Sequence, residues 1–373
     1  MVSGRGLRVA LDAHVVGRRK TGNETYIVNL AEALGRREDI DPIVYLDADA
    51  VWPGPTALHR RDLRWRAPQL RVPLELPLRA KRDGGQLLHV QYVAPPLAAL
   101  PIVTAIHDVS FEDMPGLFPR LTELRLKLTV SLSAKRSAAV ITISEFTRSR
   151  ISQHYGIDPG GIFVTPLGVD PWWHPLSQDE AASSLHDLDL PARFVCAVGN
   201  LHPRKNIPRL IRAVAAAREA GAGDLHVVLA GQRGWHTAEL DATIEGLGAG
   251  AWVRELGYVD RSSLRALYSA AHVVAYPSLY EGFGLPVLEA MACGAVVLAA
   301  DTTAIPEVAG DAALLVSPTD GESLAEGVAR VATDEALRQR LRAAGPARAA
   351  EFTWARCAEA TVVAYRHAVD AAG

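Results

Sequence analysis

The stretch Ser278-Leu-Tyr-Glu281-Gly-Phe-Gly-Leu-Pro286-Val-Leu-Glu289-Ala-Met-Ala-Cys-Gly294 decides how this sequence is interpreted. It follows the apolar run His272–Tyr276, which is typical of a buried strand. Gly282 and Gly284 allow a tight turn with the backbone close to a ligand. Pro286 suits the first turn of a helix. The stretch therefore predicts a strand, a turn and a helix in succession.

Two carboxylates and three backbone amides border this predicted turn. The amides of Phe283, Gly284 and Leu285 lie at the start of the helix, where free N–H groups favour a phosphate. Glu281 lies in the turn and Glu289 lies one turn inside the helix, so both can face one pocket. Carboxylates accept hydrogen bonds from hydroxyls, which suits a sugar and a ribose. The alternative is an ordinary helix start with acidic residues near its positive end.

Outside this stretch, short runs rich in Val and Ile alternate with helix-like segments. Because these runs are continuously apolar, they indicate strands covered on both faces, as in parallel sheets. The fold class is therefore α/β, with two doubly wound Rossmann-like domains that face each other across a cleft lined by the carboxyl ends of the strands. The expected strands are Leu7–Ala13, Ile43–Leu46, Leu87–Gln91, Ile102–Ile106, Ala139–Ile143, Ile162–Thr165, Phe194–Val198, Leu225–Ala230, Trp252–Leu256, His272–Tyr276, Ala295–Leu298 and Ala313–Val316.

The length of 373 residues also favours two domains, at roughly 150 residues each. Residues 1–170 are expected to form the first domain and residues 194–350 the second. A linker is expected over 171–193. The three cysteines, Cys196, Cys293 and Cys357, are widely spaced, which excludes a disulfide framework or a CxxC metal site and suits a reducing cytosol.

Two segments could be mistaken for targeting or membrane segments. Leu7–Val16 is interrupted by charged residues and therefore does not resemble a signal peptide. Gly84–His107 has no Asp, Glu, Lys or Arg and is long enough to span a bilayer. Its three prolines and two glutamines favour two buried strands joined by a loop instead.

The net charge of −3 conceals an asymmetry. Residues 1–170 hold 22 basic and 18 acidic residues, which leaves 17 basic and 24 acidic residues in the remainder. Arg60–Arg82 alone has eight basic and two acidic residues. Such a face could meet phosphates, nucleic acid or an anionic membrane, or it could be an ordinary solvated surface. No nucleic acid is expected as a partner.

The stretch around Glu281 resembles the retaining nucleotide-sugar glycosyltransferases of family 4, which have the two-domain GT-B fold. The family signature is two glutamates separated by seven residues, which Glu281 and Glu289 match. The Glu-Gly-Phe-Gly-Leu-Pro and Ala-Cys-Gly sequences around them are also similar. The resemblance implies that Glu281 contacts hydroxyls of the donor sugar and Glu289 the nucleotide ribose. It also implies that the amides of Gly282, Phe283, Gly284 and Leu285 hold phosphate.

A basic loop, Gly199-Asn-Leu-His-Pro-Arg204-Lys205-Asn206, follows the first strand of the second half. Adjacent cations at the end of a strand could bind a diphosphate and stabilise it as it departs. An isolated Arg-Lys pair is usually solvated surface, but the family has a matching basic loop. Many relatives carry arginine directly after the glycine, where this chain has Asn200, so Arg204 and Lys205 are the candidate cations of this loop.

Three more loops match the donor site of the family. Gly231-Gln-Arg-Gly234 and Gly257-Tyr258-Val259-Asp260 are candidates for holding the base, although either could be a plain turn. The segment Thr21–Tyr26, which contains Gly22, resembles the glycine loop that faces the donor phosphate; the alternative is a generic turn with an N-capping residue.

Two sites in the first half also have family counterparts. His107 ends the strand Ile102–Ile106, and the resemblance places such a histidine beside the donor sugar; a lone histidine is otherwise more often structural. Ser144-Glu145 also matches a family pattern, although a helix N-cap is an equally good role.

The segment Pro119–Ala134 has leucines at helical spacing, namely Leu121, Leu124, Leu128 and Leu132. Basic residues flank them, namely Arg120, Arg125, Lys127, Lys135 and Arg136. The leucines either pack in the core or form a basic amphipathic helix that lies on membranes, as in relatives with lipid-linked acceptors. The segment that contains Phe352, Trp354 and Tyr365 resembles the terminal helix of the family, which implies that residues 351–373 cross back to the first domain. The resemblance also implies that the first domain binds the acceptor and the second domain binds the nucleotide sugar.

The sequence has no Ser-His-Asp set, HExxH or Asp-x-Asp motif, so we expect electrostatic, metal-independent catalysis without a cofactor. The nucleotide sugar is a substrate: GDP-mannose is favoured and a UDP-sugar is next. The expected acceptor is a hydroxyl of a glycan or lipid-linked molecule, and the resemblance implies retention of configuration. The expected location is cytoplasmic, with possible contact at the inner face of the plasma membrane. The alternatives are an epimerase or phosphorylase, a non-catalytic binding protein, or an oxidoreductase, which the missing GxGxxG disfavours.

Overall fold

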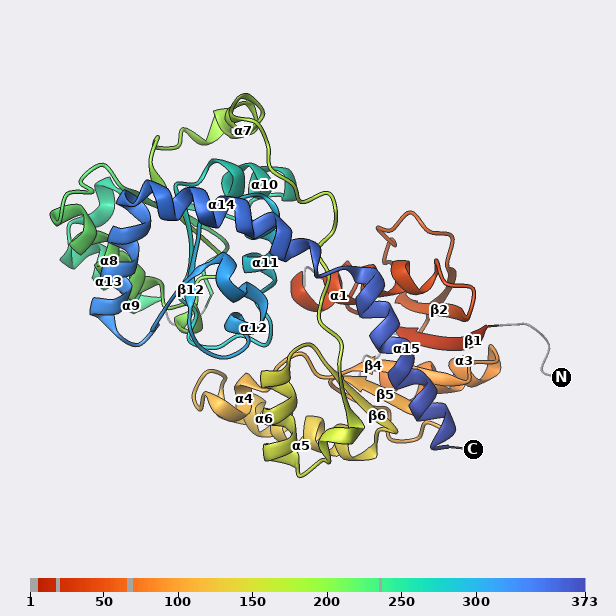
Figure 1. The fold of residues 1–373 in the computed structure, drawn as a ribbon. Helices are drawn as coiled ribbons and strands as arrows, with labels where there is room; N and C mark the ends of the chain where they lie inside the picture. Colours follow the sequence, from red (N-terminus) through yellow and green to blue (C-terminus); the bar gives the residue numbers. More distant parts are fainter. Residues whose placement is uncertain (1–5, 18–20, 66–69, 235–236, 373) are drawn as a thin grey trace. The chain divides into compact units, whose positions relative to one another are not determined.

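The computed structural model describes residues 6–17, 21–65, 70–234 and 237–372. It contains two compact units. The first unit joins the chain up to Gly168 to the C-terminal segment from Thr353, and the second unit comprises Val169–Phe352. Each unit is built on its own sheet of parallel strands covered by helices (Figure 1).

The first unit has a seven-stranded parallel sheet with the order β3-β2-β1-β4-β5-β6-β7. Its strands run from the middle of the sheet outward in two directions, which is the doubly wound arrangement. Their bounds are β1 (Leu7–Asp12), β2 (Ile40–Asp47), β3 (His59–Leu63), β4 (Leu87–Gln91), β5 (Ile102–Ala105), β6 (Ala139–Thr142) and β7 (Ile162–Val164).

Helices cover both faces of this sheet because successive strand residues point to opposite faces. On one face, Leu88 and Val90 of β4 pack in a cluster with Leu76 and Ala80 of α3. On the other face, His89 bonds to side chains of α1 and α15. The helices are α1 (Thr21–Leu34), α3 (Leu76–Arg82), α4 (Ser110–Asp113), α5 (Arg120–Arg136), α6 (Glu145–Tyr155) and α15 (Trp354–Asp370).

Strand β3 was not predicted, because it has the composition of a surface loop. Its sequence is His-Arg-Arg-Asp-Leu, and only Leu63 is buried. The strand lies at the edge of the sheet and pairs only with β2. Charged residues on an edge strand prevent pairing with other chains, so they are compatible with a strand here. They also account for part of the basic stretch Arg60–Arg82, in which Arg71 is instead buried and pairs with Asp47 at 2.6 Å.

The second unit has a six-stranded parallel sheet with the order β10-β9-β8-β11-β12-β13. Its strands are β8 (Phe194–Val198), β9 (His226–Ala230), β10 (Val253–Gly257), β11 (Val273–Tyr276), β12 (Val297–Ala300) and β13 (Leu314–Val316). Its helices are α7 (Gln178–Leu185), α8 (Ile207–Glu219), α9 (Ala238–Gly246), α10 (Arg261–Ala270), α11 (Leu285–Ala292), α12 (Ile305–Ala309), α13 (Gly321–Thr333) and α14 (Glu335–Ala350). The fold class is therefore as predicted, with two Rossmann-like α/β domains.

The segments expected to join or leave the domains have defined structure. Residues 171–193 contain α7, whose N-cap Ser177 forms a capping box with Glu180. Helix α7 packs against α10 of the second unit. The segment from Thr353 contains α15, which packs against α1 and β6 of the first unit. Its N-cap, Thr353, accepts a hydrogen bond from the amide of Arg356.

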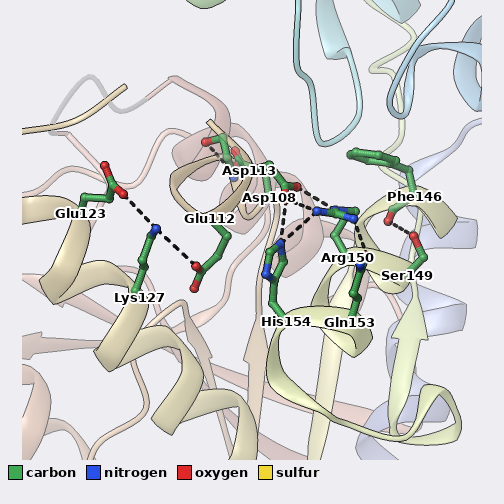
Figure 2. A network of polar contacts seen from close by, with 11 residues as sticks. Asp108, Glu112, Asp113, Glu123, Lys127, Phe146, Ser149, Arg150, Gln153 and His154 are labelled. Atoms are coloured by element: carbon green, nitrogen blue, oxygen red, sulfur yellow. Dashed lines mark hydrogen bonds and ion pairs between the residues drawn. The ribbon is translucent and has the colours of Figure 1, made fainter. Parts of the chain in front are cut away.

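The uncharged stretch Gly84–His107 forms β4, a loop and β5, as the prolines indicated. None of the helices in the described part of the chain combines the length and the apolar character that crossing a bilayer requires. Figure 2 shows how the short helix α4 is fixed to α6 beyond β5: Asp113 accepts hydrogen bonds from Arg150 and forms a pair with His154 at 2.7 Å.

Candidate functional site

The turn between β11 and α11 has the predicted course. Strand β11 ends at Tyr276 and α11 begins at Leu285, with Pro286 in its first turn. Gly284 is the N-cap and has a φ of +102°. A Cβ atom at this position would lie 2.5 Å from Cδ1 of Ile305. Only glycine fits without strain, and it lets the backbone turn sharply into the helix, whose first amides have no partner within the helix, as at any helix start.

Glu281 is held in this turn by the loop that follows β12. Its amide donates to Oγ1 of Thr303 at 3.2 Å, and its carbonyl accepts from the amide of Ala304 at 3.4 Å. Thr303 has a φ of +59°, in the left-handed region that threonine rarely occupies. Such strained positions cluster at functional sites, where the surrounding structure holds them in place.

Lys205 and Arg204 both reach the carboxylate of Glu281. Nζ of Lys205 lies 2.7 Å from Oε1 of Glu281 and 2.5 Å from the hydroxyl of Tyr276. The same ammonium lies 4.3 Å from the centre of the Tyr276 ring. Nη1 of Arg204 lies 3.5 Å from Oε2 of Glu281 and donates to the carbonyl of Tyr280 at 3.1 Å. The structure thus brings together three of the predicted catalytic residues in the second unit.

Backbone contacts fix the basic loop against the Glu281 turn. The carbonyl of Arg204 accepts from the amide of Leu279 at 2.8 Å. Asn206, with a φ of +58°, donates from its side-chain amide to the carbonyls of Pro277 at 3.1 Å and Pro318 at 2.7 Å. Asparagine is one of the few residues that tolerates this conformation. The two loops therefore form one preorganised unit.

The charges of this cluster are strongly coupled. Burial alone would raise the pKa of Glu281, but the positive charges of Arg204 and Lys205 outweigh burial and lower it to about 2. His202 has its pKa lowered to about 4 by burial and by the same two cations, so it is neutral at physiological pH. Two cations therefore surround one carboxylate, and the cluster keeps a net positive charge that suits an anion.

Glu289 is in the opposite electrostatic situation. It lies on α11, where its carboxylate accepts from the hydroxyl of Tyr268 at 3.4 Å. Burial raises its pKa to about 8, and Arg261 only partly compensates. Burial and the charges of both Glu281 and Glu289 raise the pKa of Tyr276 far above its usual range. Both acids therefore raise the pKa of the same phenol. The two acids differ from each other in protonation at neutral pH.

The loops after β8, β9 and β10 meet at the same edge of the sheet. The amide of Gly231 donates to the carbonyl of Gly257 at 2.7 Å. A Cβ atom at Gly231 would lie 2.1 Å from the carbonyl oxygen of Gly199, so glycine is required for this close approach. Tyr258 is 67% exposed and Val259 is half-buried. These residues line the carboxyl edge of the sheet, where the sequence predicted a binding site for the base.

The remaining residues of the predicted phosphate loop offer backbone rather than side chains. The ring of Phe283 is buried and packs edge-on against Phe352 at 5.9 Å. Gly282 is buried and Leu285 is partly buried. The side chain of Phe283 is therefore structural, and the predicted contact of this segment with phosphate would come from backbone amides.

In the first unit, His107 is the second residue after β5 and is buried. Its Nε2 lies 3.2 Å from Oε1 of Gln91. The rings of Tyr26 and Tyr92 pack edge-on against its imidazole at 4.4 Å and 5.7 Å. Burial lowers the pKa of His107 to about 4, so its imidazole is neutral at physiological pH. It can position a hydroxyl but does not carry a positive charge.

The other two predictions in the first unit concern residues at the starts of helices. Gly22 lies exposed in the first turn of α1 rather than in a loop, and the adjacent basic run Arg18–Lys20 lies outside the described residues. Ser144 is the N-cap of α6, because its hydroxyl accepts from the amide of Thr147 at 3.1 Å. Its capping role, one of the two roles considered, is the one that the geometry shows.

Sequence reasoning missed Tyr276, Thr303 and Gln91. Tyr276 was assigned only as the last residue of a strand, although the last residues of parallel strands are regularly placed at ligand sites. Nothing in the sequence marks Thr303, because its importance lies in a left-handed backbone. Among the described residues, no cluster of three His, Cys, Asp or Glu side chains is arranged to hold a metal ion.

Two models of known protein families match this chain. Residues 180–348 match the family model described as glycosyl transferases group 1. Residues 21–173 match the model described as glycosyltransferase family 4. The two models thus cover most of both units.

Similar sequences include several bacterial transferases. The O-antigen chain mannosyltransferase B of Escherichia coli is 33% identical over 265 residues, which are 71% of this chain and 70% of that protein. The MMP alpha-(1->4)-mannosyltransferase of Mycolicibacterium hassiacum is 30% identical over 240 residues, or 63% of this chain and 56% of that protein. The serotype-specific mannosyltransferase WbdA of Escherichia coli is 32% identical over 235 residues, but the match spans only 28% of its length.

Solved structures share the fold over nearly the whole chain. HepE of Anabaena, in complex with UDP-glucose, has a TM-score of 0.76 at 20% identity and covers 96% of this chain and 99% of its own. The sucrose-phosphate synthase of Thermosynechococcus elongatus has a TM-score of 0.75 at 21% identity, with 96% and 98% covered. The chain therefore belongs to glycosyltransferase family 4, and it is a glycosyltransferase with the GT-B fold.

Proposed function

We propose that this chain transfers a mannosyl group from GDP-mannose to a hydroxyl of a glycan or lipid-linked acceptor, with retention of configuration. The observation that carries the proposal is the cluster of Lys205, Arg204 and Glu281 beside the start of α11. Glu281 binds hydroxyls of the sugar, and Glu289 binds the ribose of the nucleotide. The amides of Phe283, Gly284 and Leu285 bind the phosphates.

The proposed mechanism is electrostatic. As the bond between the sugar and the phosphate breaks, negative charge grows on the leaving nucleoside diphosphate. Arg204, Lys205 and the first amides of α11 stabilise this charge in a site whose donors are already in place. Charge-assisted hydrogen bonds of this kind contribute roughly 1.5–3 kcal/mol each. The acceptor hydroxyl attacks the anomeric carbon as the bond to the phosphate breaks, and its proton passes to the departing phosphate oxygen. His107, in the first unit, is proposed to contact a substrate hydroxyl.

The identity of the sugar rests on the relatives. Several similar sequences are named as mannosyltransferases, and others as D-inositol 3-phosphate glycosyltransferases. We therefore place GDP-mannose first and a UDP-sugar second as donor. A thermal-shift comparison of GDP, UDP, ADP and their sugars separates these donors, because a ligand at 100 times its Kd adds about 2.7 kcal/mol of stability.

The decisive test is the initial rate of sugar transfer in site variants. Glu281→Gln keeps the size of the side chain but removes the charge, and Lys205→Met removes the ammonium. We expect Lys205→Met to lower kcat by about 100-fold or more, as removal of one preorganised charge-stabilising group does. We expect Glu281→Gln to lower kcat/KM by about 10-fold or more, because a charged hydrogen bond to a sugar hydroxyl is lost. The matched control is Arg212→Ala on α8, an exposed residue paired with Glu239 at 3.2 Å. Wild-type rates in both site variants would refute the proposal, and product analysis without acceptor distinguishes transfer from epimerisation.

We also propose that α5 lies on the anionic surface of the cytoplasmic leaflet. The four leucines that could have packed in the core are exposed instead: Leu121 by 84%, Leu124 by 66%, Leu128 by 60% and Leu132 by 52%. The exposed basic residues on or beside this stripe are Arg120, Arg125, Lys135 and Arg136. Apolar side chains flanked by cations match a membrane interface with anionic lipids.

Acidic residues do not interrupt this face of α5. Glu123 forms an ion pair with Lys127 at 2.9 Å, and Glu112 of α4 lies 3.7 Å from the same ammonium (Figure 2). Lys127, counted among the flanking cations in the sequence, therefore serves to bind α4 to α5. At the other end, Arg136 donates to the carbonyl of Pro96, next to Leu97, which is 73% exposed and extends the apolar surface.

Vesicle sedimentation tests this contact. The wild-type chain is expected to sediment with vesicles of mixed anionic and neutral phospholipid and to remain in solution with neutral ones. Leu124→Gln combined with Leu128→Gln should abolish binding, whereas Leu247→Gln, at a 43% exposed leucine of the second unit, should not. Equal sedimentation of all three proteins would refute the membrane proposal and leave the transferase proposal intact.

A further inference from the structure

We propose that Gln91 contacts the substrate and, together with His107, recognises a hydroxyl of the sugar or acceptor. This inference rests on the proposed function, because it assumes that His107 faces a sugar substrate. It adds a residue to which the sequence assigned no role. It also specifies the chemistry that this part of the first unit recognises.

Gln91 and His107 lie side by side at the carboxyl edge of the sheet. Gln91 is the last residue of β4, and His107 follows the neighbouring parallel strand β5. Gln91 is 6% exposed and His107 is 7% exposed. In doubly wound folds, ligands bind at this edge. The pair is therefore in the right place for a substrate, and it is nearly enclosed by protein.

The hydrogen bonds of this pair are incomplete. Oε1 of Gln91 lies 3.2 Å from Nε2 of His107, but the buried Nε2 of Gln91 has no partner among the described residues. An unsatisfied buried polar group is costly, so such groups in native structures normally have a ligand or water as partner. His107 has no second hydrogen bond to a described residue that would occupy Nδ1. One amide nitrogen and one ring nitrogen therefore remain available.

These two groups are complementary to a hydroxyl. Because burial keeps His107 neutral, its Nε2 donates to Gln91 and its Nδ1 can only accept. The amide of Gln91 can only donate at its free nitrogen. If the amide is turned over, the two roles exchange, and the pair still presents one donor and one acceptor. A hydroxyl both donates and accepts, whereas a phosphate or carboxylate would face the lone pair of the acceptor.

The backbone next to Gln91 is strained in a way that fixes this geometry. Tyr92 has a φ of +60°, in the left-handed region, although its bulky side chain disfavours that conformation. Its amide is held by the carbonyl of Ala105 at 2.9 Å, and its ring packs against His107. Non-glycine residues in this conformation cluster at ligand sites. Two consecutive residues, Gln91 and Tyr92, thus both contact the imidazole of His107.

The nearby His89 shows what a purely structural histidine looks like here. One ring nitrogen lies 3.2 Å from the hydroxyl of Tyr26 and the other 2.7 Å from the hydroxyl of Tyr365. Both nitrogens are satisfied within the protein. Gln91 lies two residues further along the same strand and His107 lies after the neighbouring strand, so their open positions are a local exception to the packing around them.

The test is Gln91→Met, which keeps the shape of the side chain and removes its polar atoms. The only bond inside the described protein that this change removes is the one between Oε1 of Gln91 and His107, so the thermal midpoint should fall by no more than a few degrees. We expect kcat/KM for transfer from GDP-mannose to fall about 10- to 100-fold, since a buried substrate hydroxyl loses its partner. The matched control is Gln86→Met, just before the amino end of the same strand, where the glutamine accepts from the amide of Arg8.

Deoxy analogues of donor and acceptor separate recognition from a structural role. For wild type, one deoxy compound should react about 10- to 100-fold more slowly; for Gln91→Met, the same compound should react as fast as the parent. A second variant, Gln91→Glu, places a carboxylate beside His107 and should shift the acid limb of the pH–rate profile to higher pH. If wild type transfers sugar but Gln91→Met matches it with every compound, the inference is wrong. If wild type transfers from no nucleotide sugar, the proposed function fails first.

Discussion

Replacing Glu281 with glutamine tests the electrostatics of the site through the stability of the protein. Glu281 has its pKa lowered from 4.5 to about 2, because Arg204 and Lys205 outweigh the effect of burial. A group with a lowered pKa in the folded state adds stability above its unfolded pKa, and this stability is lost as the pH falls through the folded pKa. The difference of roughly 2.5 pKa units corresponds to about 3 kcal/mol at pH 7.

The pH dependence identifies this contribution. At pH 3 about 2 of these 3 kcal/mol should already be lost, because the unfolded chain is then protonated and the folded chain only partly so. We therefore expect the free energies of unfolding of wild type and Glu281→Gln to differ most at pH 7 and to converge toward pH 2. Urea unfolding at fixed pH, followed by circular dichroism, measures both values.

A matched substitution controls for general effects of charge. Glu239→Gln removes a carboxylate that is 68% exposed and pairs with Arg212, so it should change stability by less than about 1 kcal/mol at every pH. This electrostatic explanation is refuted if the difference in the free energy of unfolding between wild type and Glu281→Gln does not change from pH 7 to pH 3. It is also refuted if Glu239→Gln shows the same pH dependence.

Three other predictions concern the donor site. Burial raises the pKa of Glu289 to about 8, so stability should fall as the pH rises from about 4.5 to 8. Glu289→Gln should therefore raise the thermal midpoint at pH 8 more than at pH 5; an equal effect at both would contradict this. Gly284→Ala should destabilise the protein by about 1–3 kcal/mol in urea unfolding, because alanine is strained at a φ of +102°; Gly246→Ala, where space is open, is the control. EDTA should leave the rate of sugar transfer unchanged, since Arg204 and Lys205 supply the positive charge; a rate that collapses and recovers with Mg²⁺ would show otherwise.

The strands of both sheets could be predicted because burial on two faces leaves a continuous apolar run. Leu87–Gln91 and Phe194–Val198 have the bounds that the sequence indicated. Strand β3 lacked this signal because only one of its residues, Leu63, is buried. An edge strand is stabilised by pairing with its neighbour, and its side chains carry little information about that pairing.

The site could be predicted only where the chemistry is local. Glu281, Gly284 and the start of α11 are close together in the sequence, so spacing was sufficient. That Lys205 reaches Glu281 depends on the packing of β8 beside β11. The orphaned amide of Gln91 depends on what its neighbours fail to provide, which no sequence pattern describes. The leucines of α5 have the spacing of a core-facing helix, and only the structure shows that nothing in the described chain covers them.

A crystal structure of the chain with GDP-mannose would show whether the donor binds at the start of α11. We expect the diphosphate to lie against the amides of Phe283, Gly284 and Leu285 and within hydrogen-bond distance of Lys205. We also expect Glu281 to accept hydrogen bonds from hydroxyls of the mannose and Glu289 from hydroxyls of the ribose. A diphosphate bound elsewhere on the second unit, or two glutamates that contact neither sugar, would contradict the proposed donor site.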